Sequence, residues 1–347
     1  MPFGFDLLVS RKISPPEREE VISLLARSSL AFDEGAELIA LIRSKERDGE
    51  RLAATASLFG NVIRMVAVDR DFQEEGLSAS AVSALLEASR AGGRHHVFIY
   101  TKQDAAARFA MIGFKRVAET DTAALLEIGA PGAEDYREYL ANSRIDAGAG
   151  KIGAIVLNGN PFTLGHRYLI ERASELCGAL YVIVVEEERS LFSFKDRFAM
   201  AELGVKDIGA KNTAVLRSGE YAVSAATFPS YFLKDRAVLS VAEQQTRLDI
   251  AVFLNVYAPP LGLNARFAGS EPTSAVTAVY NDTMRRILPQ NGIEFFEIER
   301  AEAAGKAVSA SAVRDMLSSG ATEHIREYLP ESTITYLIEQ LSYKLPI

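Results

Sequence analysis

The stretch Ala154-Ile-Val-Leu-Asn-Gly-Asn-Pro-Phe-Thr-Leu-Gly-His166 connects an apolar run to an amphipathic segment. Residues 154–157 are apolar without a break, which is typical of a strand buried on both faces of a parallel sheet. The apolar residues that follow recur at helical spacing: Leu169, Ala173, Leu176 and Cys177. We therefore predict a strand, a loop and a helix, with this apolar stripe facing the sheet and Cys177 as a core residue.

Four further apolar runs predict the other strands of this sheet: 181–185, 213–216, 266–268 and 294–298. Helical segments separate them, and the chain after Ser309 is predicted to be helical to its end. Strands that alternate with helices predict an α/β fold with a parallel sheet. Ligands of such sheets bind at the carboxyl ends of the strands, near the point where the strand order reverses, and a helix start there offers N–H groups to phosphate.

The first part of the chain predicts a separate, mixed α/β domain. A strand at 63–68, a helix that ends near Arg90 and a strand at 97–101 form a predicted β-α-β unit, followed by a short helix and another strand from Gly113. The polar, Gly-rich segment 143–151 predicts a linker. We place the two domains at residues 1–145 and 150–347.

The composition excludes several classes of protein. The chain has 347 residues, of which 48% are hydrophobic and 24% charged, as expected of two globular domains. A net charge of -8 argues against a general nucleic-acid binder. Four His and one Cys form no metal-ligand pattern and no disulfide framework. We find neither a signal segment nor an apolar stretch that could span a membrane, so we predict a cytoplasmic protein.

Two short motifs lie where predicted helices begin. In the first, Gly165 lets the backbone approach a ligand, and His166 can donate a hydrogen bond to a phosphate oxygen on which charge develops. The alternative is that the pair only begins the helix. In the second, Val308-Ser-Ala-Ser-Ala-Val-Arg314, the hydroxyls of Ser309 and Ser311 can meet phosphate and Arg314 lies one turn on. The alternative for Ser311 is helix capping alone.

These motifs resemble the two signatures of the nucleotidyltransferase superfamily, T/H-x-G-H and I-S-x-S-x-x-R/K, in the same order. Four more segments resemble the citrate lyase ligases: 192–197, 218–232, 269–272 and 277–284. The resemblance covers most of 151–317 and implies a Rossmann-like domain that binds ATP. The ATP-binding residues that it implies are Asn158, Asn160, Phe162, Thr163, Gly165, His166, Lys195, Arg197, Gly269, Glu271, Ser309, Ser311 and Arg314. Of these, Thr163, His166 and Arg314 are the implied catalytic residues.

Three of these assignments have alternatives. Lys195 and Arg197 are expected to approach the triphosphate, but they can equally be surface charges. Gly269 and Glu271 are expected to recognise adenosine, and the alternative is a tight turn. The segment 221–232 is expected to line the pocket for the acid or the thiol, or to be a packed loop.

The first domain resembles the GNAT acyltransferases through the segments 66–79 and 107–114. GNAT proteins hold the pyrophosphate of coenzyme A with a Gly-rich loop at a helix start. Here Gln73-Glu-Glu-Gly-Leu-Ser78 has Ser78 at the position of the second glycine, and two acidic residues that repel phosphate. We therefore expect weak or no acetyl-CoA binding, and a role in docking the carrier protein or its CoA-like arm.

The citrate lyase ligase resemblance implies an ATP-dependent, AMP-forming reaction. Acetate would form acetyl adenylate with the help of Mg²⁺, and the thiol prosthetic group on the acyl carrier subunit of citrate lyase would then accept the acetyl group. No activated Ser or Cys of the enzyme is needed. Three alternatives remain: a ligase for the carrier protein of malonate decarboxylase, a nucleotidyltransferase acting on a phosphopantetheine-type precursor, and a working N-acetyltransferase.

Overall fold

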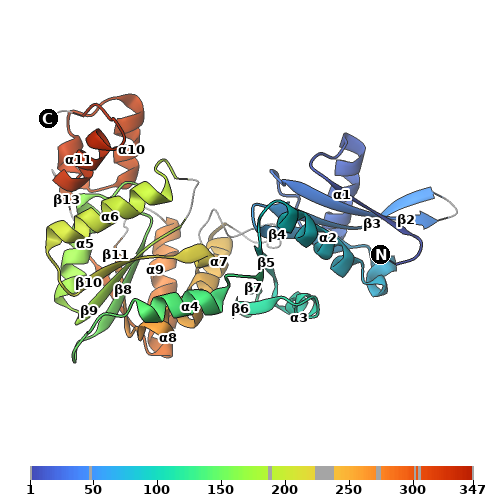
Figure 1. Ribbon diagram of the computed structural model, residues 1–347, viewed down its shortest axis with the longest axis horizontal. Coiled ribbons are helices and arrows are strands. Elements are labelled where there is room, and N and C mark those ends of the chain that lie inside the picture. Colours follow the sequence, from blue (N-terminus) through green and yellow to red (C-terminus); the bar gives the residue numbers. More distant parts are fainter. Residues whose placement is uncertain are drawn as a thin grey trace. The chain divides into compact units, whose positions relative to one another are not determined.

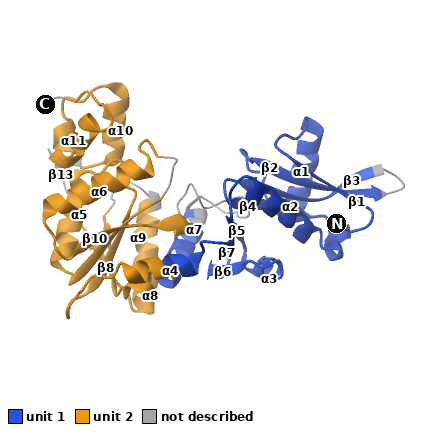
Figure 2. Ribbon diagram, viewed as in Figure 1, with its two compact units in different colours: residues 1–136, 223–255 blue, residues 137–222, 256–347 orange. Residues whose placement is uncertain are grey.

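The computed structural model describes residues 2–46, 49–186, 190–222, 238–270, 275–300, 302–303 and 306–345. The chain forms two compact units, which Figure 2 shows in different colours. Unit 1 comprises residues 1–136 and 223–255, and unit 2 comprises 137–222 and 256–347. A single boundary within 143–151 does not reproduce this division, because 223–255 belongs to unit 1. The domain limits 1–145 and 150–347 stay a prediction.

Unit 1 is built on a mixed seven-stranded sheet in the order β1-β2-β3-β4-β5-β7-β6 (Figure 1). Its strands are β1 Phe5–Ser10, β2 Leu38–Glu46, β3 Gly49–Phe59, β4 Val62–Val68, β5 His96–Lys102, β6 Lys115–Glu119 and β7 Ala123–Gly129. Its helices are α1 Pro15–Arg27, α2 Leu77–Ala91, α3 Ala106–Ala110 and α7 Val238–Val252, and α4 Ala133–Asn142 runs across the division between the units.

The predicted β-α-β unit is confirmed by β4, α2 and β5. The strands β4 and β5 are parallel, whereas the other neighbouring strands of this sheet are antiparallel. The helix α2 begins directly after Gly76, whose φ of 66° is one that glycine adopts readily. Apolar residues of α2, such as Val82 and Leu85, join the strands in one core.

A later segment of the chain completes unit 1. The helix α7 packs on β6 and β7 and buries Leu248 and Val252 completely. Its Gln244 is bonded to Thr122, and the amide of Asn255 donates to the carbonyl oxygen of Val117 over 3.3 Å. The sequence pattern gave no sign that α7 belongs to unit 1.

Unit 2 has a five-stranded, fully parallel sheet in the order β10-β9-β8-β11-β12. Its strands are β8 Ile152–Leu157, β9 Ala179–Val184, β10 Thr213–Arg217, β11 Ala265–Gly269 and β12 Glu294–Ile298, and a small hairpin joins β13 Glu302–Ala303 to β14 Lys306–Ala307. Its helices are α5 Leu164–Glu175, α6 Phe194–Ile208, α8 Ala258–Leu261, α9 Ala275–Ile287, α10 Ala310–Ser319 and α11 Glu331–Glu339. The five predicted strands and the α/β class are confirmed.

The strand order places the first motif at the point where the winding of the sheet reverses. From β8 the chain moves through α5 to β9, on one side, whereas β11 lies on the other side of β8 and leads through α9 to β12. Right-handed crossovers then put α5 and α9 on opposite faces. The loop after β8 and the end of β11 therefore meet at the carboxyl edge of the sheet, as predicted.

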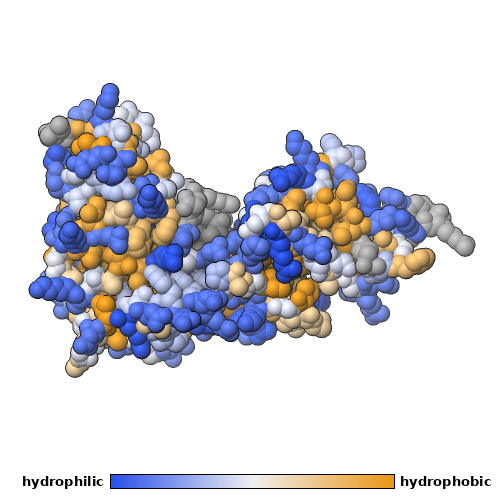
Figure 3. All heavy atoms as spheres, viewed as in Figure 1, coloured by the Kyte–Doolittle hydropathy of each residue, from blue (hydrophilic) through white to orange (hydrophobic). Residues whose placement is uncertain are grey.

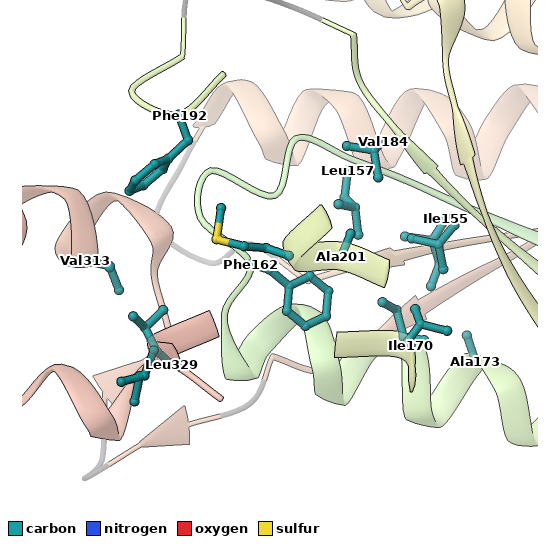
Figure 4. Packing of buried hydrophobic residues seen from close by; sticks show 14 of the residues in the cluster. Ile155, Leu157, Phe162, Ile170, Ala173, Val184, Phe192, Ala201, Val313 and Leu329 are labelled. Atoms are coloured by element: carbon teal, nitrogen blue, oxygen red, sulfur yellow. The ribbon is translucent and has the colours of Figure 1, made fainter. Parts of the chain in front are cut away.

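The motif loop is anchored in the core of unit 2. Phe162 is completely buried, and Figure 4 shows it in one packed cluster with Ile170, Ala201 and Val313. A Cβ atom on Gly204 of α6 would lie 2.6 Å from Phe162 Cζ, so the glycine makes room for this ring. The core thus fixes where the loop leaves the sheet.

The stripe predicted for α5 is correct except at its end. Ala173 is buried, and Leu169 and Cys177 pack against the core. Leu176 is 49% exposed, because α5 ends at Glu175 and the chain changes direction there. Burial raises the pKa of the Cys177 thiol to about 11, so the thiol stays protonated.

On the face drawn in Figure 3, polar residues are spread over the surface of each unit. In the described part of the chain, no helix has the length and apolar character needed to cross a membrane.

Candidate active site

A cavity of about 480 Å³ lies at the carboxyl edge of the unit 2 sheet. It is lined by the ends of β8, β11 and β12, the start of α5, part of α9 and the residues at the start of α10. Its volume falls in the range of small-molecule sites. Five of the predicted ligand residues line it: Asn158, Thr163, Gly165, His166 and Gly269.

The ring of His166 is oriented by the residue that caps its own helix. The backbone N–H of Thr163 donates to His166 Nδ1 over 3.0 Å, and the hydroxyl of Thr163 lies 2.9 Å from the same nitrogen. Because Nδ1 accepts a backbone N–H, the ring proton is on Nε2. His166 therefore carries its N–H donor at Nε2, and such a group can donate a hydrogen bond to a phosphate oxygen.

His166 is neutral in the ordinary pH range. Burial, and secondly the positive charge of Arg300, lower its pKa to about 4. The ring stacks on Phe162 with centroids 5.6 Å apart. His166 is thus suited to donate a hydrogen bond to a developing charge and unsuited to supply a proton as an imidazolium.

Two helix starts meet at the cavity. The helix α5 follows Thr163, and among the described residues the N–H of Gly165 has no hydrogen-bond acceptor. At α10 the side chain of Ser309 makes no capping hydrogen bond, and Val308 and Ala310 line the cavity. A Cβ atom on Gly165 would lie 3.4 Å from the carbonyl oxygen of Val308, which shows how close the two helix starts are. Both dipoles favour an anion here.

The two predicted glycines leave space at the cavity. A Cβ atom on Gly269 would meet nothing within 4 Å, and one on Gly165 would make only ordinary contacts at 3.4 Å and beyond. Neither glycine is required by the packing of the described protein. Glu271, the partner predicted for Gly269, lies outside the described residues.

Several predicted ligands hold the motif loop instead of lining the cavity. Phe162 is in the core, and the amide oxygen of Asn160 accepts the N–H of Phe192 over 3.2 Å. Arg314 donates to the carbonyl oxygen of Asn160 over 2.7 Å and to the hydroxyl of Ser311 over 2.8 Å. Ser311 lies within α10 and accepts from Arg314, so its hydroxyl does not cap the helix.

Arg197 connects the ends of two strands. It is completely buried, and its guanidinium donates to the carbonyl oxygens of Asn158 and Val185 over 2.7 and 2.8 Å and to Asn158 Oδ1 over 2.6 Å. This fixes the residues that follow β8 and β9. Lys195, by contrast, is exposed on the first turn of α6.

Sequence reasoning missed the residues of the cavity that follow β12, and it gave no site role to those on α9, although they lie in the segment 277–284 that resembles the citrate lyase ligases. Glu299 and Arg300 come directly after β12, and Tyr280 and Asn281 project from α9. The available signal was the position of residues 299–300 directly after a predicted strand, at the ligand edge. No group of three or more metal-binding side chains lies together in the described parts of the chain.

Unit 1 has a cavity of its own, of about 610 Å³. It is lined by Gln73, Glu74 and Ser78 of the predicted GNAT loop, and by Tyr100 and Asp104 near the end of β5. Its charged lining residues are of both signs: Asp69, Glu74, Asp104, Arg27, Arg70, Lys102 and Arg108. Of the segment 221–232, only Tyr221 and Ala222 are described.

Comparison with known proteins gives consistent matches over nearly the whole chain. The citrate lyase ligase C-terminal domain family matches residues 152–337. A citrate (pro-3S)-lyase ligase of Klebsiella pneumoniae is 35% identical over 330 residues, which is 93% of each chain. The corresponding ligase of Escherichia coli (strain K12) is 34% identical and covers 98% of this chain and 96% of the relative. A solved structure of the ribosomal-protein-S18-alanine N-acetyltransferase from Escherichia coli is 16% identical over 36% of this chain and 94% of that one, at a TM-score of 0.28.

The fold is a two-unit α/β architecture with one mixed sheet and one Rossmann-like parallel sheet, and a cavity lies at the carboxyl edge of the parallel sheet. The chain belongs to the citrate lyase ligase family. It is therefore a ligase.

Proposed function

We propose that this ligase activates citrate lyase by acetylating the thiol prosthetic group of its acyl carrier subunit, with ATP as the energy source. The observation that carries the proposal is the cavity in which two helix starts and the Nε2–H of His166 converge. The backbone N–H groups of two helix starts and an imidazole N–H at one place suit a polyphosphate. The names of the relatives supply the protein substrate.

The first step would join acetate to AMP. A carboxylate oxygen of acetate attacks the α-phosphorus of ATP, the bond to the bridging oxygen breaks, and pyrophosphate leaves with that electron pair. His166, held by Thr163, donates a hydrogen bond to a phosphate oxygen that gains charge, a contribution of about 3 kcal/mol by analogy with oxyanion holes. Because Nδ1 accepts from the backbone, the donor is preorganised and no proton has to move.

The second step would transfer the acetyl group. The sulfur of the carrier thiol attacks the acetyl carbon, AMP leaves with the bonding electrons, and the thiol proton goes to solvent or to the departing phosphate. The enzyme forms no covalent intermediate, in keeping with a Cys177 thiol that burial keeps protonated.

Mg²⁺ would enter with the ATP phosphates and neutralise part of their charge. Such an ion keeps several waters and needs only one or two protein carboxylates. Glu299 at the cavity can supply one, and no dedicated metal cage is required.

The test of this function uses isolated carrier subunits in their free-thiol form. We expect the protein with ATP, Mg²⁺ and acetate to release AMP and to consume the thiol of the citrate lyase carrier, and not that of the malonate decarboxylase carrier. Consumption of only the second thiol would assign the enzyme to the other carrier. AMP release without loss of either thiol would refute both assignments.

Acetyl transfer by unit 1 is a second candidate, which the cavity beside Ser78 favours. We rank it lower because Ser78 stands at the position of the second glycine of the GNAT phosphate loop and the curated relatives are ligases, although Arg70, Lys102 and Arg108 line the same cavity. Acetyl transfer from acetyl-CoA without ATP would be its signature.

A further inference from the structure

The cavity of unit 2 contains a cation that the sequence motifs did not indicate. Arg300 is the one positively charged residue among the described residues that line it. The three cations expected from the motifs were Lys195, Arg197 and Arg314, and none of them is among the described lining residues. Arg197 and Arg314 donate to protein carbonyl groups and so stabilise the loop.

The backbone of Arg300 is fixed to the neighbouring strand. Ser270 N–H donates to the carbonyl oxygen of Ile298 over 2.8 Å, which continues the β11–β12 pairing by one residue beyond Gly269. The hydroxyl of Ser270 then accepts the N–H of Arg300 over 3.1 Å. Arg300 is therefore held at the carboxyl edge of the sheet, beside the end of β11.

Arg300 and His166 line the same cavity. The charge of Arg300 contributes, after burial, to the low pKa of His166. The two residues differ in chemistry: His166 is a neutral donor, whereas a guanidinium keeps its charge and offers a planar fork of N–H groups that matches two phosphate oxygens.

We propose that Arg300 is a further catalytic residue of the adenylyl transfer, and that its guanidinium binds the phosphate oxygens that gain negative charge as pyrophosphate leaves. This inference rests on the proposed function. When the bond between the α-phosphorus and the bridging oxygen breaks, the electron pair goes to the pyrophosphate, and Arg300 balances this charge without losing a proton. It thereby fills the role that the sequence assigned to Arg314.

The test compares R300Q and R300K with R172Q. Arg172 is the matched control, because it is an exposed arginine on the last turn of α5 that pairs with Glu175 and does not line the cavity. We expect R300Q to lower kcat for acetate-dependent ATP–pyrophosphate exchange by about 100-fold, as for the loss of a charge-stabilising donor. R300K should recover part of this loss, and R172Q should resemble wild type. Unchanged exchange in both Arg300 variants would overturn the inference.

Two further measurements separate this inference from the proposed function. Titration of His166 by NMR should show a higher pKa in R300Q than in wild type, because a nearby positive charge has been removed. An unchanged pKa would contradict the claim that the Arg300 guanidinium lies close to His166 in the cavity. If wild type shows no exchange with acetate, the proposed function fails. In that case the ATP dissociation constant tests the role of Arg300. We expect it to rise by at least about 10-fold in R300Q. An equal dissociation constant in R300Q and wild type, or no ATP binding by wild type, would overturn the role.

Discussion

At the scale of single residues, the site depends on one unusual hydrogen bond. The backbone N–H of Thr163 donates to the ring of His166, and so the capping residue of α5 also sets the tautomer of the ring. A histidine on the first turn of a helix is ordinarily a weak functional signal. Here the cap, the stacking on Phe162 and the cavity give it one orientation and one protonation state.

The neutrality of His166 has a consequence for stability. Its folded pKa of about 4 lies below the unfolded value of 6.5, so the unfolded chain binds more protons between these two values. The neutral ring makes its full contribution to the free energy of unfolding above pH 6.5. This contribution is lost as the pH falls toward 4, by at most about 1.4 kcal/mol per pH unit.

We therefore expect the free energy of unfolding in urea to fall less between about pH 7.5 and about pH 5 in H166Q than in wild type. Equal pH slopes in H166Q and wild type would contradict a buried neutral ring.

At the scale of helices and strands, the motif loop is positioned by the packing of α6. Gly204 of α6 makes room for Phe162, and Thr333 of α11 donates to the carbonyl oxygen of Phe162 over 3.1 Å. The N–H of Leu164 donates to the carbonyl oxygen of Tyr328 over 2.9 Å. The C-terminal helical segment therefore helps to hold the motif loop.

The close approach of Gly204 and Phe162 can be tested by adding one methyl group. We expect Gly204→Ala to lower the free energy of unfolding by about 1–3 kcal/mol, since overpacking outweighs the gain in helix propensity. Combining it with Phe162→Leu should return part of the loss in a double-mutant cycle. Gly269→Ala is the control, because its Cβ would meet nothing within 4 Å. Independent, additive effects of the two substitutions would exclude a clash with the ring.

The strands of unit 2 and the place of the first motif were predictable from the sequence, because continuous apolar runs and helical spacing are local patterns. The contacts of Arg197 and Arg314 with protein carbonyl groups were not, and their binding of phosphate stays a prediction. The sequence around a basic residue near a motif does not show whether its guanidinium contacts a phosphate or a protein carbonyl group. The packing of α6 and α10 determines the carbonyl contacts seen here. Arg300 was missed because it lies in none of the motif segments and reaches the cavity through the pairing of β11 with β12.

At the scale of the whole molecule, the chain returns to unit 1 after contributing the first three strands of the unit 2 sheet. The strands β8 to β10 precede α7, and α8 and β11 follow it. An amphipathic helix in a sequence does not reveal which sheet it will cover. For this reason the sequence predicted one linker, whereas the contacts of α7 place 223–255 with unit 1.

The return of the chain predicts how fragments behave. A fragment of residues 1–145 lacks α7, so the part of β6 and β7 on which α7 packs would be exposed. We expect this fragment to bind a hydrophobic dye and to unfold at a lower temperature than the same fragment joined by a flexible linker to residues 238–255. Equal melting temperatures for the two fragments would show that α7 is not part of the folding unit.

The central claim is that the unit 2 cavity catalyses adenylyl transfer to acetate, and ATP–pyrophosphate exchange without any carrier tests it most directly. We predict exchange that requires acetate and Mg²⁺ and that falls by about 100-fold or more in H166Q, whose loss of the Nε2 donor removes one charge-stabilising hydrogen bond. Exchange that ignores acetate but requires a phosphopantetheine-type substrate, or acetate-dependent exchange at the wild-type rate in folded H166Q, would contradict the claim.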